Sequence, residues 1–310
     1  MRIIVTGGLG FIGSNFVNLL NERLPKIEVV ILDKMTYAAD PNSIIKNNKL
    51  IKKDICDVTP EDLGVYDYIV HFAAESHVDN SISDGRPFMN TNIIGTFNLV
   101  ECAKQNKSLK KFIHISTDEV YGDMADSEWL SSNEDHNLSP SSYYSSSKAS
   151  SDMIVLSSHR TFGLPYLLTR TCNNYGENQN KEKFLPKIFD SIINEKTVPV
   201  YGDGKQIREW MYVKDNVEVI FDLMMDDKVV NEVYNIGTDN TFYNLELVKK
   251  ISEIIGKDVT FEFVTDRLGH DRKYNLDCTK LKEYYKSKGK EYQPKDIIDW
   301  MNQFLLEEVV

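Results

Sequence analysis

Two adjacent acids, Asp118 and Glu119, follow a short apolar run in the segment KFIHISTDEVYG (111–122). When two carboxyl groups share a partly desolvated cleft, their pKa values separate, so one can act as a general acid and the other as a general base. Neighbouring side chains of a strand point to opposite faces. Both acids can therefore face one pocket only if the strand has become a loop at Thr117, and we predict that it has. The alternative is a pair of solvated turn acids.

A second candidate pair is Tyr144 and Lys148, four residues apart in a segment (142–162) that we expect to be helical. That spacing places the phenol and the ammonium group on one face of the helix, a turn apart. A tyrosine can act as a base near neutral pH only if its pKa falls from about 10 to about 7, and a neighbouring cation has the right sign for this. The same pair also arises by chance on exposed helices.

The start of the chain matches a dinucleotide-binding fingerprint. Gly8, Gly10 and Gly13 have the spacing G-x-G-x-x-G, between a β-branched run and an amphipathic stretch. Such glycines permit a tight turn and a close approach to a pyrophosphate. Asp33 lies 20 residues beyond Gly13, where an acid can bind ribose hydroxyls and would repel a 2′-phosphate, which favours NAD over NADP. The adjacent Lys34 weakens that preference, and a glycine-rich turn without a ligand is the alternative.

Predicted strands and helices alternate along most of the chain. We expect strands at 2–6, 29–33, 67–74, 111–116 and 165–170, and helices at about 11–23, 87–105 and 142–162. This alternation is typical of an α/β fold with a Rossmann-type doubly wound parallel sheet, in which ligands bind at the carboxyl ends of the strands. We expect an NAD-binding Rossmann domain at 1–172, with a return at about 212–238. A smaller, interleaved C-terminal α/β substrate lobe is expected at 173–211 and 239–310.

The composition narrows the classes of partner. The 310 residues include 36 basic and 47 acidic ones, and the net charge of −11 disfavours nucleic acid and anionic membranes. The four cysteines form no CxxC pair, so neither a metal site nor a disulfide framework is indicated. Because no signal peptide and no long apolar run is found, we expect a cytoplasmic protein. An anionic ligand would have to be held by a few local cations.

Several longer motifs make the chain similar to the extended short-chain dehydrogenase/reductase family. They are AAESHVDNSI (73–82), STDEVYG (116–122), YSSSKASSD (144–152), NNYG (173–176), YGDGKQIREW (201–210) and DRLGHDRKY (266–274). Together they resemble the nucleoside-diphosphate-glucose 4,6-dehydratases over nearly the whole chain. The TDE triplet is the informative one, because related epimerases lack the acid pair and related decarboxylases usually have a serine in place of Asp118.

The resemblance implies an internal redox cycle on a sugar nucleotide, with NAD as cofactor. Tyr144, supported by Lys148, would take the proton of the carbon 4 hydroxyl while hydride passes to NAD⁺. Thr117 would hydrogen-bond the sugar near its carbon 4 oxygen. Glu119 would then remove the carbon 5 proton, and Asp118 would donate a proton to the departing carbon 6 hydroxyl. Hydride would finally return to carbon 6.

The expected substrate is dTDP-glucose, whose 4-keto-6-deoxy product is a step toward deoxysugars such as rhamnose. UDP-glucose stays open, because thymine and uracil differ by one methyl group, worth about 1 kcal/mol. A sugar-nucleotide 4-epimerase or decarboxylase is opposed by the acid pair, and a non-catalytic NAD-binding interaction protein would not need the full residue set. The resemblance also implies a homodimer, formed through the helix that carries Tyr144 and Lys148 and the helix before it.

The resemblance further assigns ligand contacts residue by residue. The cofactor contacts would be Gly7, Gly10, Phe11, Ile12, Gly13, Asp33, Lys34, Thr36, Asp54, Ile55, Phe72, Ala73, Ala74, Ser76, Thr91, Tyr144, Lys148 and Asn173. The substrate contacts would be Ser76, Thr117, Asn174, Lys183, Phe184, Leu185, Val200, Tyr201, Arg208, Asn244, Arg267 and His270. The arginines suit the diphosphate, because a guanidinium fork matches phosphate oxygens.

Two further features concern the surroundings of this site. His71, His77 and His114 have no ligand spacing, so we expect buried packing histidines. Where the family usually has prolines after NNYG, residues 177–183 are ENQNKEK, which we expect to loosen the loop that ends at Lys183.

Overall fold

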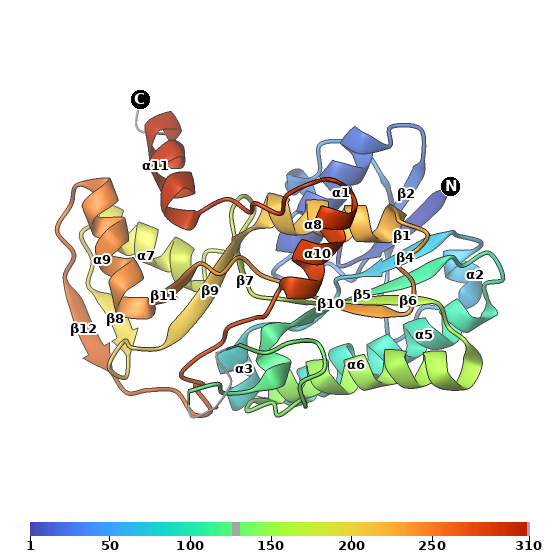
Figure 1. The fold of residues 1–310 in the computed structure, drawn as a ribbon, viewed down its shortest axis with the longest axis horizontal. Coiled ribbons are helices and arrows are strands. Elements are labelled where there is room, and N and C mark those ends of the chain that lie inside the picture. The colour runs from blue at the N-terminus through green and yellow to red at the C-terminus, as the bar shows by residue number, and fades with distance from the viewer. Residues whose placement is uncertain (126–130, 309–310) are drawn as a thin grey trace.

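The structure of the protein, a computed structural model, describes residues 1–125 and 131–308. Within these residues, seven parallel strands form one sheet in the order β10-β6-β5-β4-β1-β2-β3 (Figure 1). The strands are β1 (Arg2–Thr6), β2 (Glu28–Asp33), β3 (Lys49–Lys52), β4 (Tyr68–His71), β5 (Lys111–Thr117), β6 (Tyr166–Thr171) and β10 (Glu232–Ile236). The order runs outward from β1 in both directions, which confirms the predicted doubly wound sheet.

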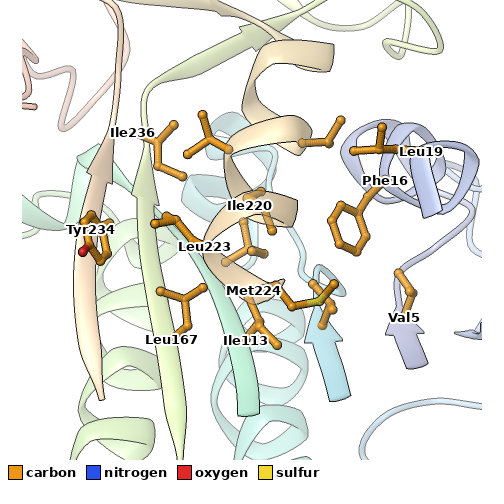
Figure 2. Packing of buried hydrophobic residues seen from close by; sticks show 14 of the residues in the cluster. Val5, Phe16, Leu19, Ile113, Leu167, Ile220, Leu223, Met224, Tyr234 and Ile236 are labelled. Atoms are coloured by element: carbon orange, nitrogen blue, oxygen red, sulfur yellow. The ribbon is translucent and has the colours of Figure 1, made fainter. Parts of the chain in front are cut away.

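Helices cover both faces of this sheet, which is why its central strands are buried at nearly every position. On one face, Ile3 and Val5 of β1 pack with α1 (Phe11–Arg23) and α8 (Val213–Met225). On the other face, Ile4 belongs to a cluster with α5 (Thr96–Gln105) and α6 (Tyr143–Phe162). Figure 2 shows the first cluster, in which residues of both helices meet the strands: Val5, Phe16, Leu19, Ile113, Leu167, Ile220, Leu223, Met224, Tyr234 and Ile236.

The helix predicted at 142–162 is confirmed as α6, and its ends are fixed by caps. Ser142 and Ser145 form a capping box at its start, and Gly163 ends it in the left-handed conformation with φ 72°. The segment predicted as one helix at 87–105 consists of three pieces. α4 (Arg86–Phe88) is followed by a π-helical turn (Met89–Gly95) and then by α5.

The strand β5 ends at Thr117, and the two adjacent acids begin a short 3-10 helix (Asp118–Tyr121). Thr117 caps this turn, because its hydroxyl accepts a hydrogen bond from the backbone N–H of Glu119 at 3.3 Å. The predicted end of the strand at Thr117 is therefore confirmed, with a helical turn in place of an open loop. This turn breaks the alternation that would send the two acids to opposite faces.

A second layer of elements forms a lobe beside the sheet (Figure 1). Its strands are β7 (Asn173–Tyr175), β8 (Val198–Tyr201), β9 (Ile207–Tyr212), β11 (Thr241–Tyr243) and β12 (Phe261–Val264). Its helices α7 (Phe184–Ile193), α9 (Asn244–Ile255) and α11 (Ile297–Glu308) contribute to a core of their own. Between these segments, α8 and β10 return to the large sheet and α10 (Thr279–Ser287) packs beside β10.

The predicted domain boundaries stay a prediction, and residues 309 and 310 of the predicted lobe lie outside the described residues. β3 was not predicted, because this edge strand is short and mostly exposed and so has no continuous apolar run. None of the helices in the described residues is long and apolar enough to cross a membrane.

Candidate active site

A cavity of about 330 Å³ lies at the carboxyl ends of β1, β2, β4 and β5. All the residues predicted for catalysis line it: Thr117, Asp118, Glu119, Tyr144 and Lys148. The predicted cofactor residues that line it are Gly7, Gly10, Phe11, Ile12, Gly13, Asp33, Lys34, Thr36, Ile55, Phe72, Ala73, Ala74, Ser76, Thr91, Tyr144, Lys148 and Asn173. Among the predicted substrate residues, Ser76, Thr117, Asn174 and Lys183 line it. The structure thus joins the cofactor and catalytic sets in one space.

The glycine turn leaves no room for a side chain at Gly7 or at Gly13. Gly7 has φ +66°, and a Cβ atom there would lie 2.7 Å from the backbone nitrogen of Ala73. A Cβ atom on Gly13 would lie 2.2 Å from the carbonyl oxygen of Gly7. The start of α1 therefore rests directly on the end of β1, with the unpaired N–H groups of its first turn available to an anion. Residues 7–13, here called the glycine cradle, therefore fit the pyrophosphate of a dinucleotide.

Asp33 ends β2 and is held by the backbone. Its two carboxylate oxygens accept hydrogen bonds from Leu9 N at 3.1 Å and from Met35 N at 2.8 Å. Each oxygen keeps a free lone pair, so the fixed carboxylate can also accept from ribose hydroxyls. The ammonium group of Lys34 lies 3.3 Å from Glu75 and 3.7 Å from Asp54. Both acids thus contact Lys34, and Asp54 does not line the cavity.

The acid pair sits in a desolvated part of the cavity. The hydroxyl of Thr117 donates to Asp118 Oδ1 at 3.1 Å. Burial raises the pKa of Asp118 well above its ordinary value, and the charge of Glu119 raises it further. Burial also raises the pKa of Glu119, but Arg267 and Arg208 oppose this rise. The environment therefore raises the pKa of both acids and makes Asp118 the more readily protonated of the two.

Tyr144 and Lys148 project from α6 into the same cavity. Lys148 donates from Nζ to the carbonyl oxygen of Ile115 at 2.7 Å, and burial lowers the pKa of this lysine to about 8. Burial raises the pKa of Tyr144, and Glu119 raises it further, against a hydrogen bond with Thr117. We expected Lys148 to help lower the pKa of Tyr144. The net shift is upward instead, because burial and the charges of the acid pair raise this pKa.

Two of the histidines expected to be packing residues lie on neighbouring strands of the sheet, His71 on β4 and His114 on β5. His71 contacts the hydroxyls of Thr6 at 2.7 Å and Thr96 at 2.9 Å, and burial lowers its pKa well below the ordinary value. His114 is fully buried beside Asp152, with a separation of 3.3 Å. Both are confirmed as buried packing histidines. His77 is half-buried at the start of α3 (Val78–Ser83).

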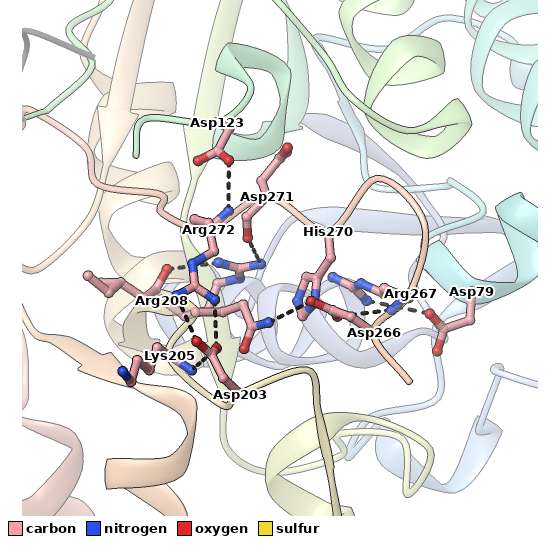
Figure 3. A network of polar contacts seen from close by, with 12 residues as sticks. Asp79, Asp123, Asp203, Lys205, Arg208, Asp266, Arg267, His270, Asp271 and Arg272 are labelled. Atoms are coloured by element: carbon pink, nitrogen blue, oxygen red, sulfur yellow. Dashed lines mark hydrogen bonds and ion pairs between the residues drawn. The ribbon is translucent and has the colours of Figure 1, made fainter. Parts of the chain in front are cut away.

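The predicted substrate cations of the lobe lie outside the cavity lining, each with partners from the protein (Figure 3). Arg267 pairs with Asp79 of α3 at 3.5 Å. His270 contacts Asp266 at 2.6 Å. Arg208 donates to backbone carbonyl oxygens, among them that of Asp271 at 2.8 Å. Each of these groups thus has a partner within the protein, although the buried Nε of Arg267 has no hydrogen-bond partner among the described residues.

The remaining predicted substrate residues have structural positions in the lobe. Leu185 and Val200 belong to its buried core, and Phe184 stacks on Trp210 with ring centroids 5.8 Å apart. Asn244 begins α9, and Tyr201 ends β8 with 38% of its surface exposed. None of these residues lines the described cavity. Their assignment to the substrate stays a prediction.

Several cavity residues were not predicted. Most come from the segment after β2 and from the loop after β7, with one beside Ser76: Tyr37, Ala38, Ala39, Glu75, Asn178, Gln179, Asn180 and Glu182. The others belong to the ends of β2, β5 and β6 or directly follow β6: Leu32, Ile115, Ser116, Thr171 and Cys172. The first group follows Asp33 so closely that its position in the sequence could have indicated it. The second group lies in the 177–183 loop, whose unusual composition was noted but whose position over the cavity depends on distant contacts.

Comparison with known proteins places this site in a family. A family model described as GDP-mannose 4,6 dehydratase matches residues 4–297. The chain is 43% identical over 290 residues to the low-salt glycan biosynthesis protein Agl12 of Haloferax volcanii, covering 91% of this chain and 92% of that protein. It is 41% identical over 310 residues to the dTDP-glucose 4,6-dehydratase of Haemophilus influenzae, covering 91% of each.

A solved structure is similar over almost the full length. It is DesIV, a dTDP-glucose 4,6-dehydratase from Streptomyces venezuelae solved with NAD bound. The TM-score is 0.89 at 37% sequence identity, and the match covers 98% of this chain and 95% of that chain.

Proposed function

Because the chain belongs to the GDP-mannose 4,6 dehydratase family, we propose that it is an NAD-dependent hydro-lyase that converts dTDP-glucose to dTDP-4-keto-6-deoxyglucose. The observation that carries this proposal is the acid pair. Asp118 and Glu119 line one cavity with Tyr144, in surroundings that raise the pKa of Asp118 more strongly than that of Glu119. An epimerase on the same scaffold would need no such pair of acids.

The cavity fits NAD by the properties of its own residues. Gly7 and Gly13 would bring the backbone close to the pyrophosphate, and Asp33 would bind the ribose hydroxyls. NAD, when bound, supplies a reversible hydride acceptor for the sugar. The remaining predicted cofactor residues that line the cavity would form its walls.

The catalytic residues would move protons at three positions of the sugar. Tyr144 would take the proton of the carbon 4 hydroxyl, which Thr117 orients by a hydrogen bond. The resulting ketone acidifies the carbon 5 hydrogen, which Glu119 would remove. Asp118 would protonate the carbon 6 hydroxyl as it leaves as water. Lys148 would place a positive charge near the phenol, which has the sign that favours the phenolate but does not outweigh the rise in the Tyr144 pKa caused by burial and the acid pair.

The diphosphate would be bound by Lys183 at the cavity and by Arg208 and Arg267 on the lobe side. Their guanidinium groups suit phosphate oxygens, and the net charge of −11 makes such local cations necessary. The product would be a precursor of deoxysugars such as rhamnose, and we place the enzyme in the cytoplasm. UDP-glucose is the second candidate substrate, since one methyl group distinguishes the bases.

We also propose a homodimer that buries the outer face of the α5 and α6 layer. Large apolar side chains are exposed on this layer: Ile94, Phe97, Tyr143, Met153 and Phe162. They come from two helical segments that lie side by side under the sheet (Figure 1). Exposed apolar side chains along one layer of a protein are typical of an interaction surface. Size-exclusion chromatography with light scattering should give twice the chain mass, and a single chain mass would contradict the dimer.

The function is tested by incubating the purified protein with dTDP-glucose, and separately with UDP-glucose, in deuterated water. We expect a product that has lost one water and gained one deuterium at carbon 5, with no net NADH, by mass spectrometry and proton NMR. The relative rates would rank the two bases. A galactose nucleotide without deuterium would contradict the dehydratase and support an epimerase.

A further inference from the structure

We propose that residues 177–183, here called the strap, retain NAD in the cavity, and that Tyr37 and Glu182 fasten the strap. The proposal rests on the proposed use of NAD. The strap leaves β7 at one end and reaches α7 at the other. Asn178, Gln179, Asn180, Glu182 and Lys183 all line the cavity. A bound cofactor would therefore lie beneath it.

The first residues of the strap are anchored to α1 and to the lobe. The carboxylate of Glu177 accepts hydrogen bonds from the Tyr212 hydroxyl at 2.8 Å and from Lys214 Nζ at 2.7 Å. Its carbonyl oxygen accepts from Asn15 Nδ2 at 2.9 Å. Asn15 belongs to the helix that begins at the glycine turn. The beginning of the strap is thus fixed next to the pyrophosphate cradle by side-chain contacts instead of prolines.

The last residues of the strap reach the opposite side of the cavity. The Tyr37 hydroxyl donates to Glu182 Oε1 at 3.1 Å, and Lys183 Nζ donates to the carbonyl oxygen of Ser76 at 3.1 Å. Tyr37 follows β2, and Ser76 follows β4, so these two bonds connect the strap to the strand ends that form the cofactor cavity. The strap therefore spans the cavity from α1 to β2 and β4, and a ligand beneath it leaves only when these bonds open.

The Tyr37–Glu182 contact is suited to a fastening that opens from time to time. Tyr37 is 64% exposed, so water can replace its bond to Glu182. Burial and the charge of Glu182 raise the pKa of Tyr37 to about 12, so its hydroxyl stays a donor at neutral pH. The chemistry also demands retention. The hydride taken from carbon 4 must return to carbon 6 of the same sugar, so loss of the reduced cofactor between these steps would strand a keto sugar and stop the cycle.

The test measures cofactor release without any sugar nucleotide. NADH bound to the wild-type protein and to variants is chased with excess NAD⁺, and the loss of bound NADH fluorescence gives the dissociation rate. Tyr37→Phe and Glu182→Leu should each release NADH about three to ten times faster, as expected for one hydrogen bond at a charged acceptor near the surface. The double variant should be no faster than the faster single variant, because both changes remove one shared bond.

The matched control is Tyr243→Phe, which removes the hydroxyl of a tyrosine that is 47% exposed in the lobe and does not line the cavity. It should release NADH at the wild-type rate. Release at the wild-type rate from both strap variants would overturn the strap while leaving the proposed function intact. Multiplying effects in the double variant would overturn the Tyr37–Glu182 fastening. A wild-type protein that binds no NADH would overturn the cofactor and the strap together.

Discussion

The two sides of the candidate site are built in different ways. On the cofactor side, Gly7, Gly13 and Asp33 are fixed by backbone contacts, and the residues predicted to bind the cofactor line one cavity, with Asp54 as the exception. On the lobe side, the predicted substrate cations contact the protein's own acids and carbonyl groups. The ion pair between Arg267 and Asp79 is an example of such a contact. The cofactor side is therefore preassembled, whereas a substrate bound by these lobe cations would have to compete with their present partners.

This difference between the two sides affects the free energy of ligand binding. A backbone cradle needs no rearrangement when a ligand arrives, so the full contact energy contributes to affinity. A paired cation must first lose its partner, and the exchange of one anion for another gives only the difference between the two interactions. We therefore expect changes in the buried centre and the cofactor side to have large effects, and changes among the lobe cations to have small ones.

The largest effect is expected at the acid pair, which lies between the two sides. Glu119→Gln should lower the dehydration rate by about 10²- to 10⁴-fold, because it removes the group that we propose takes the carbon 5 proton. Oxidation at carbon 4 does not need this group. Single-turnover experiments should therefore show NADH accumulating in the variant with dTDP-glucose, while deuterium incorporation at carbon 5 is lost.

Asp118→Asn is the matched comparison, because it changes the neighbouring acid on the same turn. It should slow the loss of water while exchange of the carbon 5 hydrogen with solvent continues, since Glu119 is intact. NMR of the recovered sugar nucleotide distinguishes the two variants. Identical behaviour of both would contradict the separate roles of the acids.

An intermediate effect is expected at the glycine cradle. Gly13→Ala would place a Cβ atom 2.2 Å from the backbone oxygen of Gly7, so α1 must shift away from β1. We expect NAD affinity to fall about ten- to 100-fold and the free energy of unfolding to fall by about 1–3 kcal/mol. Calorimetric titration with NAD and chemical denaturation measure the two quantities.

Gly256→Ala provides the control for that variant. It adds the same methyl group at the C-terminal end of α9, where, apart from its chain neighbours, no atom of the described residues lies within 4 Å, although the positive φ of 72° remains unfavourable for alanine. The free energy of unfolding should fall by about 1 kcal/mol with no change in NAD affinity. An equal loss of NAD affinity in both variants would show that the cradle has no special role.

The cofactor side could be predicted from the sequence because its signals are local. The glycine turn and Asp33 belong to one strand-helix-strand unit, and the buried strands are continuous apolar runs. The end of β5 at Thr117 could also be predicted, because two adjacent acids cannot share a pocket on a regular strand. The raised pKa of Tyr144 could not, since it depends on burial and on the acid pair, which belongs to a different element.

The lobe side was less predictable because its contacts join distant segments. The partner of Arg267 is Asp79 in α3, and nothing in the sequence near either residue indicates the other. Leu185 and Val200 are apolar residues in family-like segments, and only the packing of the lobe places them in its core. The strap likewise depends on the hydrogen bond between Tyr37 and Glu182, two residues that lie far apart in the sequence.

The smallest effect is expected where the two sides meet. If the substrate diphosphate must displace Asp79 from Arg267, then Asp79→Asn should bind dTDP about two to five times more tightly, because a partly exposed ion pair of this kind is worth little. Titration of dTDP into the NAD-loaded protein measures this change. Raising the salt concentration should reduce the difference between variant and wild type, since screening weakens the competing pair.

The control is Asp84→Asn, which removes the same charge from a nearby acid whose partner is Arg86 at 3.1 Å on the surface. It should bind dTDP like the wild type, so a gain in both variants would reflect only the change in net charge. Weaker binding in Asp79→Asn would mean that Asp79 orients Arg267 for the diphosphate instead of competing with it. In that case the lobe side would be preassembled as well, and the contrast with the cofactor side would disappear.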